Sequence, residues 1–302
     1  MLEVTLLGTG GTMPLKDRWL SSCLIKHMGH SILIDCGEGT QIALKHSENK
    51  FKPIDIICIT HFHADHISGL PGFLLSMSNE GRTEPVTIIG PVGLKKVVNA
   101  LCIIAPNLPF ELKLLEYPTD IPEFESGDIK ITPFSAKHSV VCTGYNFKLK
   151  RVGKFDVEKA KKNHVPMKIW GQLQKHETVI SDGIEYKQNM VLGNARKGIK
   201  ITYCTDSRPT ENIINHARNA DLLIYEGMFG DDDKLARAVE TGHSLFSEAA
   251  RLAKNADVKK LWLTHYSPSL TEPDLYLNTV TDIFPNAELG FDGKSETLNF
   301  PE

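Results

Sequence analysis

Three histidines and one aspartate fall within six residues of this 302-residue chain, in the stretch Thr60-His61-Phe62-His63-Ala64-Asp65-His66. Neutral imidazole and carboxylate are the side chains that bind borderline divalent metals, above all zinc. His61 and His63 stand two residues apart and can point the same way, whereas Asp65 and His66 follow on the next turn and can serve a second ion. Four donors are too few for a closed two-metal site, so the cluster predicts further ligands elsewhere in the chain.

Apolar runs precede this cluster and three further candidate ligands. The run from Ile54 to Ile59 reads as a buried strand that ends just before the cluster. His138, Asp206 and His265 also stand at the ends of strand-like runs, and the carboxylate of Asp206 can bridge two ions. Open α/β folds place their sites at the carboxyl ends of strands, so seven donors can converge there. Two metals can generate a nucleophile at neutral pH and neutralise a phosphoryl oxygen, but they can equally polarise a carbonyl, which leaves the substrate open.

The same pattern predicts two similar halves. The run from Lys260 to His265 has the same pattern as the run from Ile57 to His61, because both are apolar strands that end in Thr-His. We therefore expect each half to contribute ligands from its strand ends. The glycine turn Gly8 to Gly11 is expected to let the backbone approach the site closely. A helix is predicted from Pro91 to Ile104, opened by its proline.

Composition places the chain among ordinary soluble globular proteins, with 41% hydrophobic and 24% charged residues. No apolar stretch approaches membrane-spanning length, and the N-terminus enters a strand without a signal-peptide pattern. The six cysteines form no C-x-x-C pair and mostly lie in strand-like apolar runs. They are typical of reduced core residues, so we expect a cytoplasmic protein without a membrane partner.

Charge is distributed unevenly along the chain. Between Lys148 and Lys200 there are thirteen Lys or Arg against five Asp or Glu, a net charge of +8. The whole chain carries −3, so the remainder carries −11. Residues 151–198 are basic, polar and poor in alternating apolar pattern, which predicts an insertion or arm. A basic segment on an acidic body is typical of a part that binds polyanions, although a solvated insertion without a partner would look the same.

The order of the candidate ligands resembles that of a known superfamily. The order T-H-x-H-x-D-H, followed by His138, Asp206 and His265, is similar to that of the metallo-β-lactamase superfamily. This resemblance implies an α/β fold, the αββα four-layer sandwich. Glu226 at a strand end, His243 in Gly-His-Ser and the basic insertion narrow the resemblance to ribonuclease Z, a family of tRNA 3′-processing endonucleases. Because it spans essentially the whole chain, we expect a single domain over residues 1–302, with 151–198 as an inserted flexible arm.

The resemblance also implies a cofactor and its ligands. Two zinc ions per chain are expected, with Mn²⁺ as the alternative metal. One ion would be held by His61, His63 and His138, the other by Asp65, His66 and His265, and Asp206 would bridge them.

Catalytic and substrate roles follow from the same resemblance. Asp65 would orient or deprotonate the attacking water. His243, set by Glu226, would stabilise or protonate the leaving oxygen. The arm would bind precursor tRNA through basic residues that include Lys154, Lys161, Lys162 and Lys168. The family further implies a homodimer.

Two other functions fit parts of the sequence. The chain departs from the family pattern at Trp19, Tyr225, Met167-Lys168 and Ser269-Leu270, and none of these positions is a proposed ligand. The missing Arg-Tyr pair at Ser269-Leu270 favours a phosphodiesterase or esterase acting on small molecules. A non-catalytic RNA-binding or metal-sensing protein is the third hypothesis, and the intact set of seven ligands argues against it.

Overall fold

The computed structural model describes residues 1–120 and 123–301. Within these ranges the chain forms two compact units. The larger one comprises Met1–Lys148 and Lys200–Asn299, and the smaller one comprises Leu149–Ile199 with the residues from Phe300 onward. All the predicted metal ligands belong to the larger unit.

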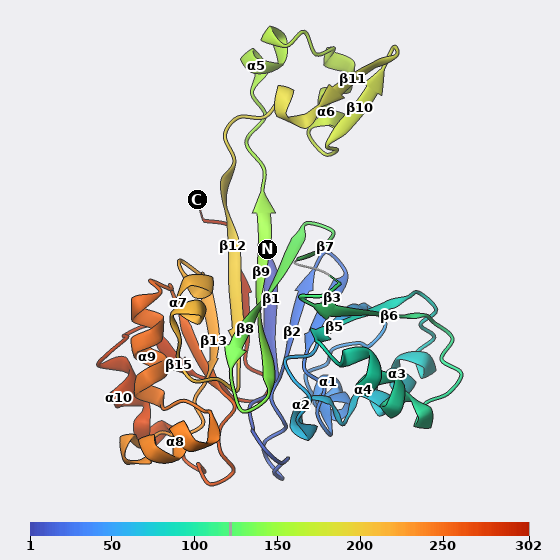
Figure 1. The fold of residues 1–302 in the computed structure, drawn as a ribbon. Helices are drawn as coiled ribbons and strands as arrows, with labels where there is room; N and C mark the ends of the chain where they lie inside the picture. Colours follow the sequence, from blue (N-terminus) through green and yellow to red (C-terminus); the bar gives the residue numbers. More distant parts are fainter. Residues whose placement is uncertain (121–122, 302) are drawn as a thin grey trace. The chain divides into compact units, whose positions relative to one another are not determined.

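Two mixed sheets of seven strands form the centre of the larger unit (Figure 1). The first sheet has, in spatial order, β16 (Ser295–Leu298), β1 (Leu2–Gly8), β2 (Ser22–His27), β3 (His30–Ile34), β4 (Ile54–Cys58), β5 (Val86–Pro91) and β6 (Leu112–Tyr117). The second has β15 (Ala287–Leu289), β14 (Leu261–Thr264), β13 (Leu222–Glu226), β12 (Arg196–Cys204), β9 (Val141–Arg151), β8 (Ile129–Lys137) and β7 (Phe124–Ser126). The strands β3 to β6 run parallel in the first sheet, and β12 to β15 run parallel in the second.

Helices cover the outer side of each sheet (Figure 1). The first sheet is covered by α1 (Thr40–His46), α3 (Leu70–Asn79) and α4 (Leu94–Leu101), and the second by α7 (Glu211–Ala217), α9 (Phe246–Asn255) and α10 (Leu277–Thr281). Two helices are short. α2 (Ala64–Ile67) follows the end of β4 and carries Asp65 and His66, and α8 (Leu235–Thr241) precedes the loop of His243. The four layers are those of the αββα sandwich, so the predicted fold and its two similar halves are confirmed.

Each half has its own apolar core. Under the first sheet, Ile57, Phe73 and Leu74 are fully buried, and under the second, Leu223, Phe246 and Leu263 are. A parallel strand such as β4 is buried on both faces, which explains why its sequence is an almost continuous apolar run rather than an alternating one.

Bonds between the halves lie close to the first histidines. The buried Tyr145 hydroxyl on β9 donates to the Ile59 carbonyl at 2.6 Å, and the Thr143 amide donates to the Thr60 carbonyl at 2.9 Å. A buried hydrogen bond of this kind contributes about 1 kcal/mol net, and much more is lost when one partner is left alone. These bonds therefore fix the strand end that carries His61.

The smaller unit contains α5 (Val157–Lys162), α6 (Trp170–Leu173) and the hairpin of β10 (Thr178–Ser181) and β11 (Ile184–Lys187). It has an apolar cluster of its own, which includes Val165, Leu173 and Val191. The polar composition of residues 151–198 did not indicate this cluster. That the segment acts as a flexible arm on a single domain stays a prediction.

One predicted element is wrong at its start. Pro91 is the last residue of β5 and does not open the following helix, because α4 begins at Leu94 after Gly93, which has a positive φ of 100°. Proline is tolerated both at helix starts and at strand ends, so its presence alone did not separate the two. Among the helices of the described ranges, none is long and apolar enough to cross a membrane.

Candidate active site

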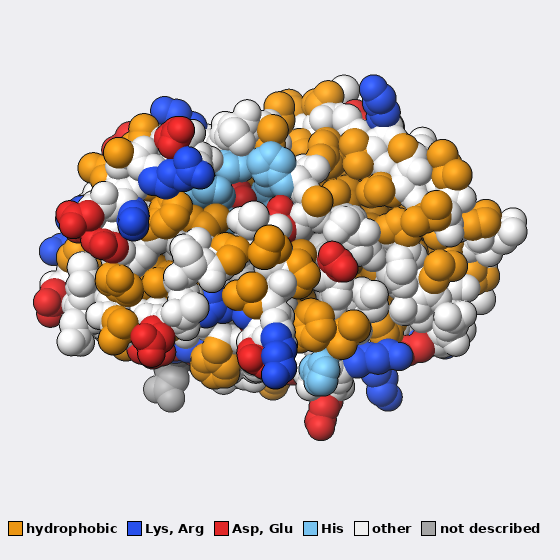
Figure 2. Space-filling view, turned by 90° about the horizontal axis from the view of Figure 1, so that it is seen from below, with side chains coloured by type: hydrophobic (Ala, Val, Ile, Leu, Met, Phe, Trp, Pro, Cys, Tyr) orange, Lys and Arg blue, Asp and Glu red, His pale blue; other side chains and the backbone are white. Residues whose placement is uncertain are grey.

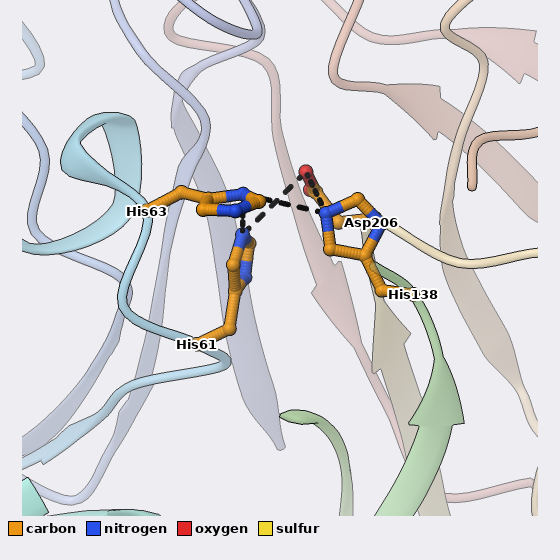
Figure 3. A group of neighbouring side chains, drawn as sticks. All are labelled: His61, His63, His138 and Asp206. Carbon is orange, nitrogen blue, oxygen red and sulfur yellow. Dashed lines mark hydrogen bonds and ion pairs between the residues drawn. The ribbon is translucent and has the colours of Figure 1, made fainter. Parts of the chain in front are cut away.

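Four of the predicted ligands form one group at the carboxyl ends of β4, β8 and β12 (Figure 3). His61 Nε2 lies 3.0 Å from His63 Nδ1, and His138 Nε2 lies 3.3 Å from the same atom. Asp206 Oδ2 lies 3.7 Å from His61 Nε2 and 3.9 Å from His138 Nε2. Three ring nitrogens and one carboxylate oxygen thus face a common point.

Asp65, His66 and His265 form a second group with the other oxygen of Asp206. Asp206 Oδ1 lies 3.1 Å from His265 Nε2 and 3.3 Å from His66 Nε2. Asp65 Oδ2 lies 3.3 Å from His66 Nε2 and 3.5 Å from His265 Nε2. The structure therefore brings together all seven residues that the sequence predicted as ligands, and it places Asp206 between the two groups.

The donor atoms fit a pair of divalent cations. Bonds of 2.0–2.2 Å at tetrahedral angles place neighbouring ligand atoms about 3.3–3.6 Å apart, within the range of distances seen here. Asp206 is buried, and within the described parts of the chain its Oδ1 makes no hydrogen bond of good geometry, although two ring nitrogens lie 3.1 and 3.3 Å away. A buried carboxylate oxygen without a well-aligned donor is costly unless a cation satisfies it. That these residues bind metal stays a prediction, and the position of this oxygen supports it.

Ring tautomers direct lone pairs into the site. His138 Nδ1 lies 3.1 Å from the Gly242 carbonyl, so it carries the proton and donates it, which leaves Nε2 free for a cation. Burial lowers the pKa of His61 to about 2 and holds the pKa of His138 below its usual value. Both rings are therefore neutral and can act as ligands.

Carboxylates attract positive charge to the second group. Burial lowers the pKa of His66, but Asp206 and Asp35 outweigh it and raise that pKa well above its usual value. Burial would raise the pKa of Asp65, but hydrogen bonds with His265 and His66 bring it well below its usual range. The same field that favours a proton here favours a divalent cation.

Two of the candidate ligands have a strained backbone conformation that orients their side chains. Asp206 and His265 follow β12 and β14 with φ of 49° and 59°, in the left-handed region that costs non-glycine residues about 1–3 kcal/mol each. The sharp turn points their side chains back over the sheet edge. Glycine makes room beside His265, because a Cβ added to Gly11 would lie 2.6 Å from the His265 ring. The expected close approach of the Gly8 to Gly11 turn is thereby confirmed.

Asp35 supports the second group, and sequence reasoning missed this role. Its Oδ2 accepts from His66 Nδ1 at 2.8 Å, and its Oδ1 accepts from the Thr60 amide at 2.8 Å. Burial raises the pKa of this carboxyl, and the bonds from His66 and Thr60 offset part of the rise. The only signal in the sequence was an aspartate at the end of an apolar strand, before Cys36 and the Gly37 turn.

His243 and Glu226 form a pair beside the second group. His243 Nδ1 lies 3.0 Å from Glu226 Oε2, and the other oxygen of the buried Glu226 accepts from the Ser207 amide. Burial lowers the pKa of His243, but Glu226 outweighs it and raises the pKa to about 9. These two residues and His265 also lie close enough to hold an ion. The bond to Glu226 leaves Nε2 of His243 free, and that His243 uses it to carry a proton rather than to bind an ion stays a prediction.

Arg208 is a second residue that sequence reasoning missed. Its Nη1 donates to the His243 carbonyl at 2.5 Å and to Glu248 Oε2 at 2.7 Å, while its amide donates to the Lys137 carbonyl at 2.8 Å. Arg208 therefore ties the Asp206 loop to the loops of His138 and His243. The signal available was its position two residues after the bridging aspartate.

The basic residues of the smaller unit are exposed and weakly engaged. Lys161 pairs with Glu158 at 3.1 Å and Lys168 with Asp182 at 2.7 Å, with more than half of each side chain exposed. Exposed pairs of this kind contribute about 0–1 kcal/mol, so a phosphate can displace them. Lys154 and Lys162 are also exposed. That these four lysines contact RNA stays a prediction.

Comparisons with known proteins support the same class of fold and site. One family model, described as a beta-lactamase superfamily domain, matches residues 174–266, and another, described as anti-Pycsar protein Apyc1, matches residues 2–103. The crystal structure of the short form of human tRNase Z is 25% identical with a TM-score of 0.70, covering 99% of this chain and 100% of that one. The metallo-β-lactamase fold protein YhfI from Bacillus subtilis is 20% identical with a TM-score of 0.70, covering 98% and 100%. The fold and the site together define a hydrolase of the metallo-β-lactamase fold.

Closer relatives specify the family. The ribonuclease Z of Agathobacter rectalis is 56% identical over 302 residues, which is 100% of both chains. The ribonuclease Z of Clostridium acetobutylicum is 47% identical over 306 residues, covering 99% of each chain. The chain belongs to the ribonuclease Z family and is a hydrolytic endoribonuclease, which confirms the resemblance noted in the sequence.

Proposed function

We propose that this endoribonuclease, whose family removes the 3′ trailer from precursor tRNA, acts with two zinc ions per chain. The observation that supports the metal assignment best is the position of the Asp206 carboxylate between the two groups of ligands. Its Oδ2 faces one group of histidines, and its Oδ1 faces the other. In this assignment His61, His63 and His138 hold one ion, and Asp65, His66 and His265 hold the other. Bound divalent cations supply a nucleophile at neutral pH and neutralise charge on the phosphate.

The chain's own residues orient the reactants and move the protons. Asp65 Oδ2 accepts from the Thr12 amide at 2.7 Å, which fixes the carboxylate so that it can orient a water and receive its proton. The water oxygen bonds to phosphorus as the bond from phosphorus to the 3′-oxygen of the tRNA breaks. His243, held by Glu226, donates a proton to that leaving oxygen. The products are a tRNA with a 3′-hydroxyl and a trailer with a 5′-phosphate, and a 2′,3′-cyclic phosphate on either product would contradict this route.

The remaining assignments complete the proposal. Residues 151–198 serve as an arm that binds the precursor tRNA through its basic side chains, on a single domain formed by the rest of the chain. The enzyme acts as a homodimer in the cytoplasm. The net charge of +8 between Lys148 and Lys200 supports the arm's role.

A hydrolase for small molecules is the second candidate function. The observation that favours it is the Ser269-Leu270 sequence, where the family carries Arg-Tyr. One assay separates the two functions. Purified, metal-loaded protein is incubated with a 3′-extended tRNA and with bis(p-nitrophenyl) phosphate, each with and without a chelator.

We expect chelator-sensitive cleavage of the tRNA at the start of its trailer. Turnover of the small phosphodiester alone would support the second candidate. Binding of the tRNA without cleavage of either substrate would support the non-catalytic alternative. Elemental analysis of the same preparation should give two metal ions per chain, and a value of one or none would contradict the site assignment.

A further inference from the structure

An open pocket of about 570 Å³ adjoins His243 in the larger unit. Its lining side chains come from the loop before α8, from α8 itself and from the loop after His265, and those that matter here are Phe229, Lys234, Arg237, His243, Ser267 and Ser269. Figure 2 shows Lys or Arg side chains directly beside the exposed histidines on this face of the molecule. The proposed mechanism uses His243 but assigns nothing to the rest of the pocket.

The charge of the pocket suits an anion. Lys234 and Arg237 are both exposed, and the described lining contains no carboxylate. Arg237 Nη1 pairs with Glu240 Oε2 at 2.9 Å, with 60% and 68% of the two side chains exposed. Such a pair holds its arginine weakly, so a phosphate with two or three charged oxygens can replace Glu240. Arg237 can bind that phosphate through two parallel bonds.

An aromatic ring on a fixed backbone, that of Phe229, also lines the pocket. Phe229 is half-buried. Its carbonyl accepts from the Phe246 amide at 2.9 Å, which ties it to the start of α9, close after His243 in the chain. Met228, the residue before Phe229, is fixed as well, because its carbonyl accepts from the Ser267 amide at 3.1 Å, and both residues line the pocket. A half-buried ring beside two cations is a common arrangement for stacking a nucleic-acid base while its phosphate is neutralised.

The orientation of His243 decides which part of the RNA enters. Its Nδ1 is engaged by Glu226, so the ring can donate to a substrate only through Nε2. In the mechanism proposed above, that proton goes to the leaving 3′-oxygen. The nucleoside that carries this oxygen must therefore lie on the His243 side of the scissile phosphate, where the pocket opens.

We infer that this pocket binds the last nucleotide of the tRNA body, with its base against Phe229 and its 5′-phosphate between Lys234 and Arg237. The inference rests on the proposed function, because it takes the leaving group from that reaction. It assigns to the pocket a nucleoside 5′-phosphate as its ligand and makes Phe229, Lys234 and Arg237 positioning residues for the reaction.

The first experiment measures binding without turnover. The probe is 2-aminopurine riboside 5′-monophosphate, whose fluorescence falls when its base stacks, titrated with metal-loaded enzyme. We expect quenching with the wild type, and an affinity lower by roughly 5- to 100-fold in Phe229→Leu, the range of one lost base stack. Phe229→Tyr keeps the ring and should retain the wild-type affinity. Quenching that is equal in all three proteins would mean that the probe binds elsewhere, at the metals for instance, and would overturn the inference.

The second experiment tests the charges with RNA. In the double variant Lys234→Gln, Arg237→Gln, kcat/KM for a 3′-extended tRNA should fall at least tenfold. Its dependence on the logarithm of salt concentration should become shallower by about 0.7 to 1.8, because one or two phosphate contacts are lost. The matched control is Lys96→Gln, Lys254→Gln, which removes the same charge at exposed positions outside the pocket.

The two experiments separate the inference from the function on which it rests. If the wild type does not cut tRNA, the proposed function fails, and the fluorescence titration still decides whether the pocket holds a nucleoside 5′-phosphate. If the wild type cuts tRNA but the charge variant and its control fall equally, only the general charge of the protein matters. That outcome would overturn the inference while leaving the endonuclease intact.

Discussion

Replacement of Asp35 by Asn should weaken one proposed metal site and spare the other. The carboxylate accepts from His66 through Oδ2 and from Thr60 through Oδ1, and it is fully buried. An Asn side chain has one oxygen for these two sets of donors. If that oxygen stays with Thr60, the amide N–H groups face His66 Nδ1, and the ring must move its proton to Nε2. His66 then has no lone pair directed toward Asp206 and His265.

The structure sets the size of this effect. If the Asn side chain turns the other way, the Thr60 amide loses its buried acceptor, which costs about 1–3 kcal/mol. Loss of such a supporting partner typically lowers metal affinity by about 10- to 100-fold, or roughly 1.4–2.7 kcal/mol. The penalty should fall on the ion held by Asp65, His66 and His265, because Asp35 makes its direct contact with His66.

A competition titration with a chromophoric chelator measures this prediction. The wild type should give two tight sites, whereas Asp35→Asn should give one tight site and one weakened by at least tenfold. Asp128→Asn is the matched control, because Asp128 is 72% exposed and lies outside the site. Equal weakening of both ions, or of neither, in a protein that unfolds cooperatively would refute the tautomer argument.

Four further predictions concern the site and the arm. Asp206→Ala should abolish activity and metal binding together, measured by elemental analysis and tRNA cleavage, and retention of both would mean that another residue bridges. His243→Ala should lower turnover by about 10²- to 10⁴-fold at unchanged metal content, and metal loss would make it a ligand. Arg208→Ala should cost about 3 kcal/mol in chemical denaturation, since the largely buried Glu248 loses its cationic partner and keeps only the Leu245 amide, whereas Glu248→Gln in that background should restore part of the loss. Deleting residues 153–196 should raise KM for precursor tRNA and make its salt dependence shallower, while hydrolysis of a small phosphodiester stays unchanged. If the deletion leaves tRNA cleavage intact, the arm is only a charged insertion.

The strand ends were predictable because their signal is local. A run such as Ile54 to Ile59 followed by His61 and His63 identifies both a buried strand and the donors at its end. His138 and Asp206 were found by the same rule, and the structure places both beside His61. What the residues alone could not give was how His138, Asp206 and His265 divide between the two groups, which depends on how the two sheets pack.

Supporting residues were harder to predict because their partners are distant in sequence. Asp35 bonds to a histidine 31 residues away, and Arg208 bonds to a carboxylate 40 residues away. Neither has a local pattern of its own. The pairing of His243 with Glu226 lies in the same class, since 17 residues separate them and only the family resemblance linked them in the sequence.

Departures from the family pattern have structural partners in this chain. The hydroxyl of Tyr225, which stands where the family carries histidine, donates to the Ser207 carbonyl at 2.9 Å and lies 3.0 Å from Ser244 Oγ. It therefore joins the loop of Asp206 to the loop of His243. Leu270, another departure, has its carbonyl bound by Arg18 Nη1 at 2.9 Å. These substitutions are accommodated around the site rather than within the ligand set.

The site depends on both halves of the sandwich at once. His61 and His66 follow a strand of the first sheet, whereas Asp206 and His265 follow strands of the second and have strained φ angles. Each strained residue costs about 1–3 kcal/mol, and buried carboxylates brought close to one another add a further cost. Cation binding offsets both costs, because a ligand that binds only the folded state stabilises it by about 2.7 kcal/mol at a concentration of 100 Kd. Metal binding should therefore stabilise the contact between the sheets as well as the chemistry.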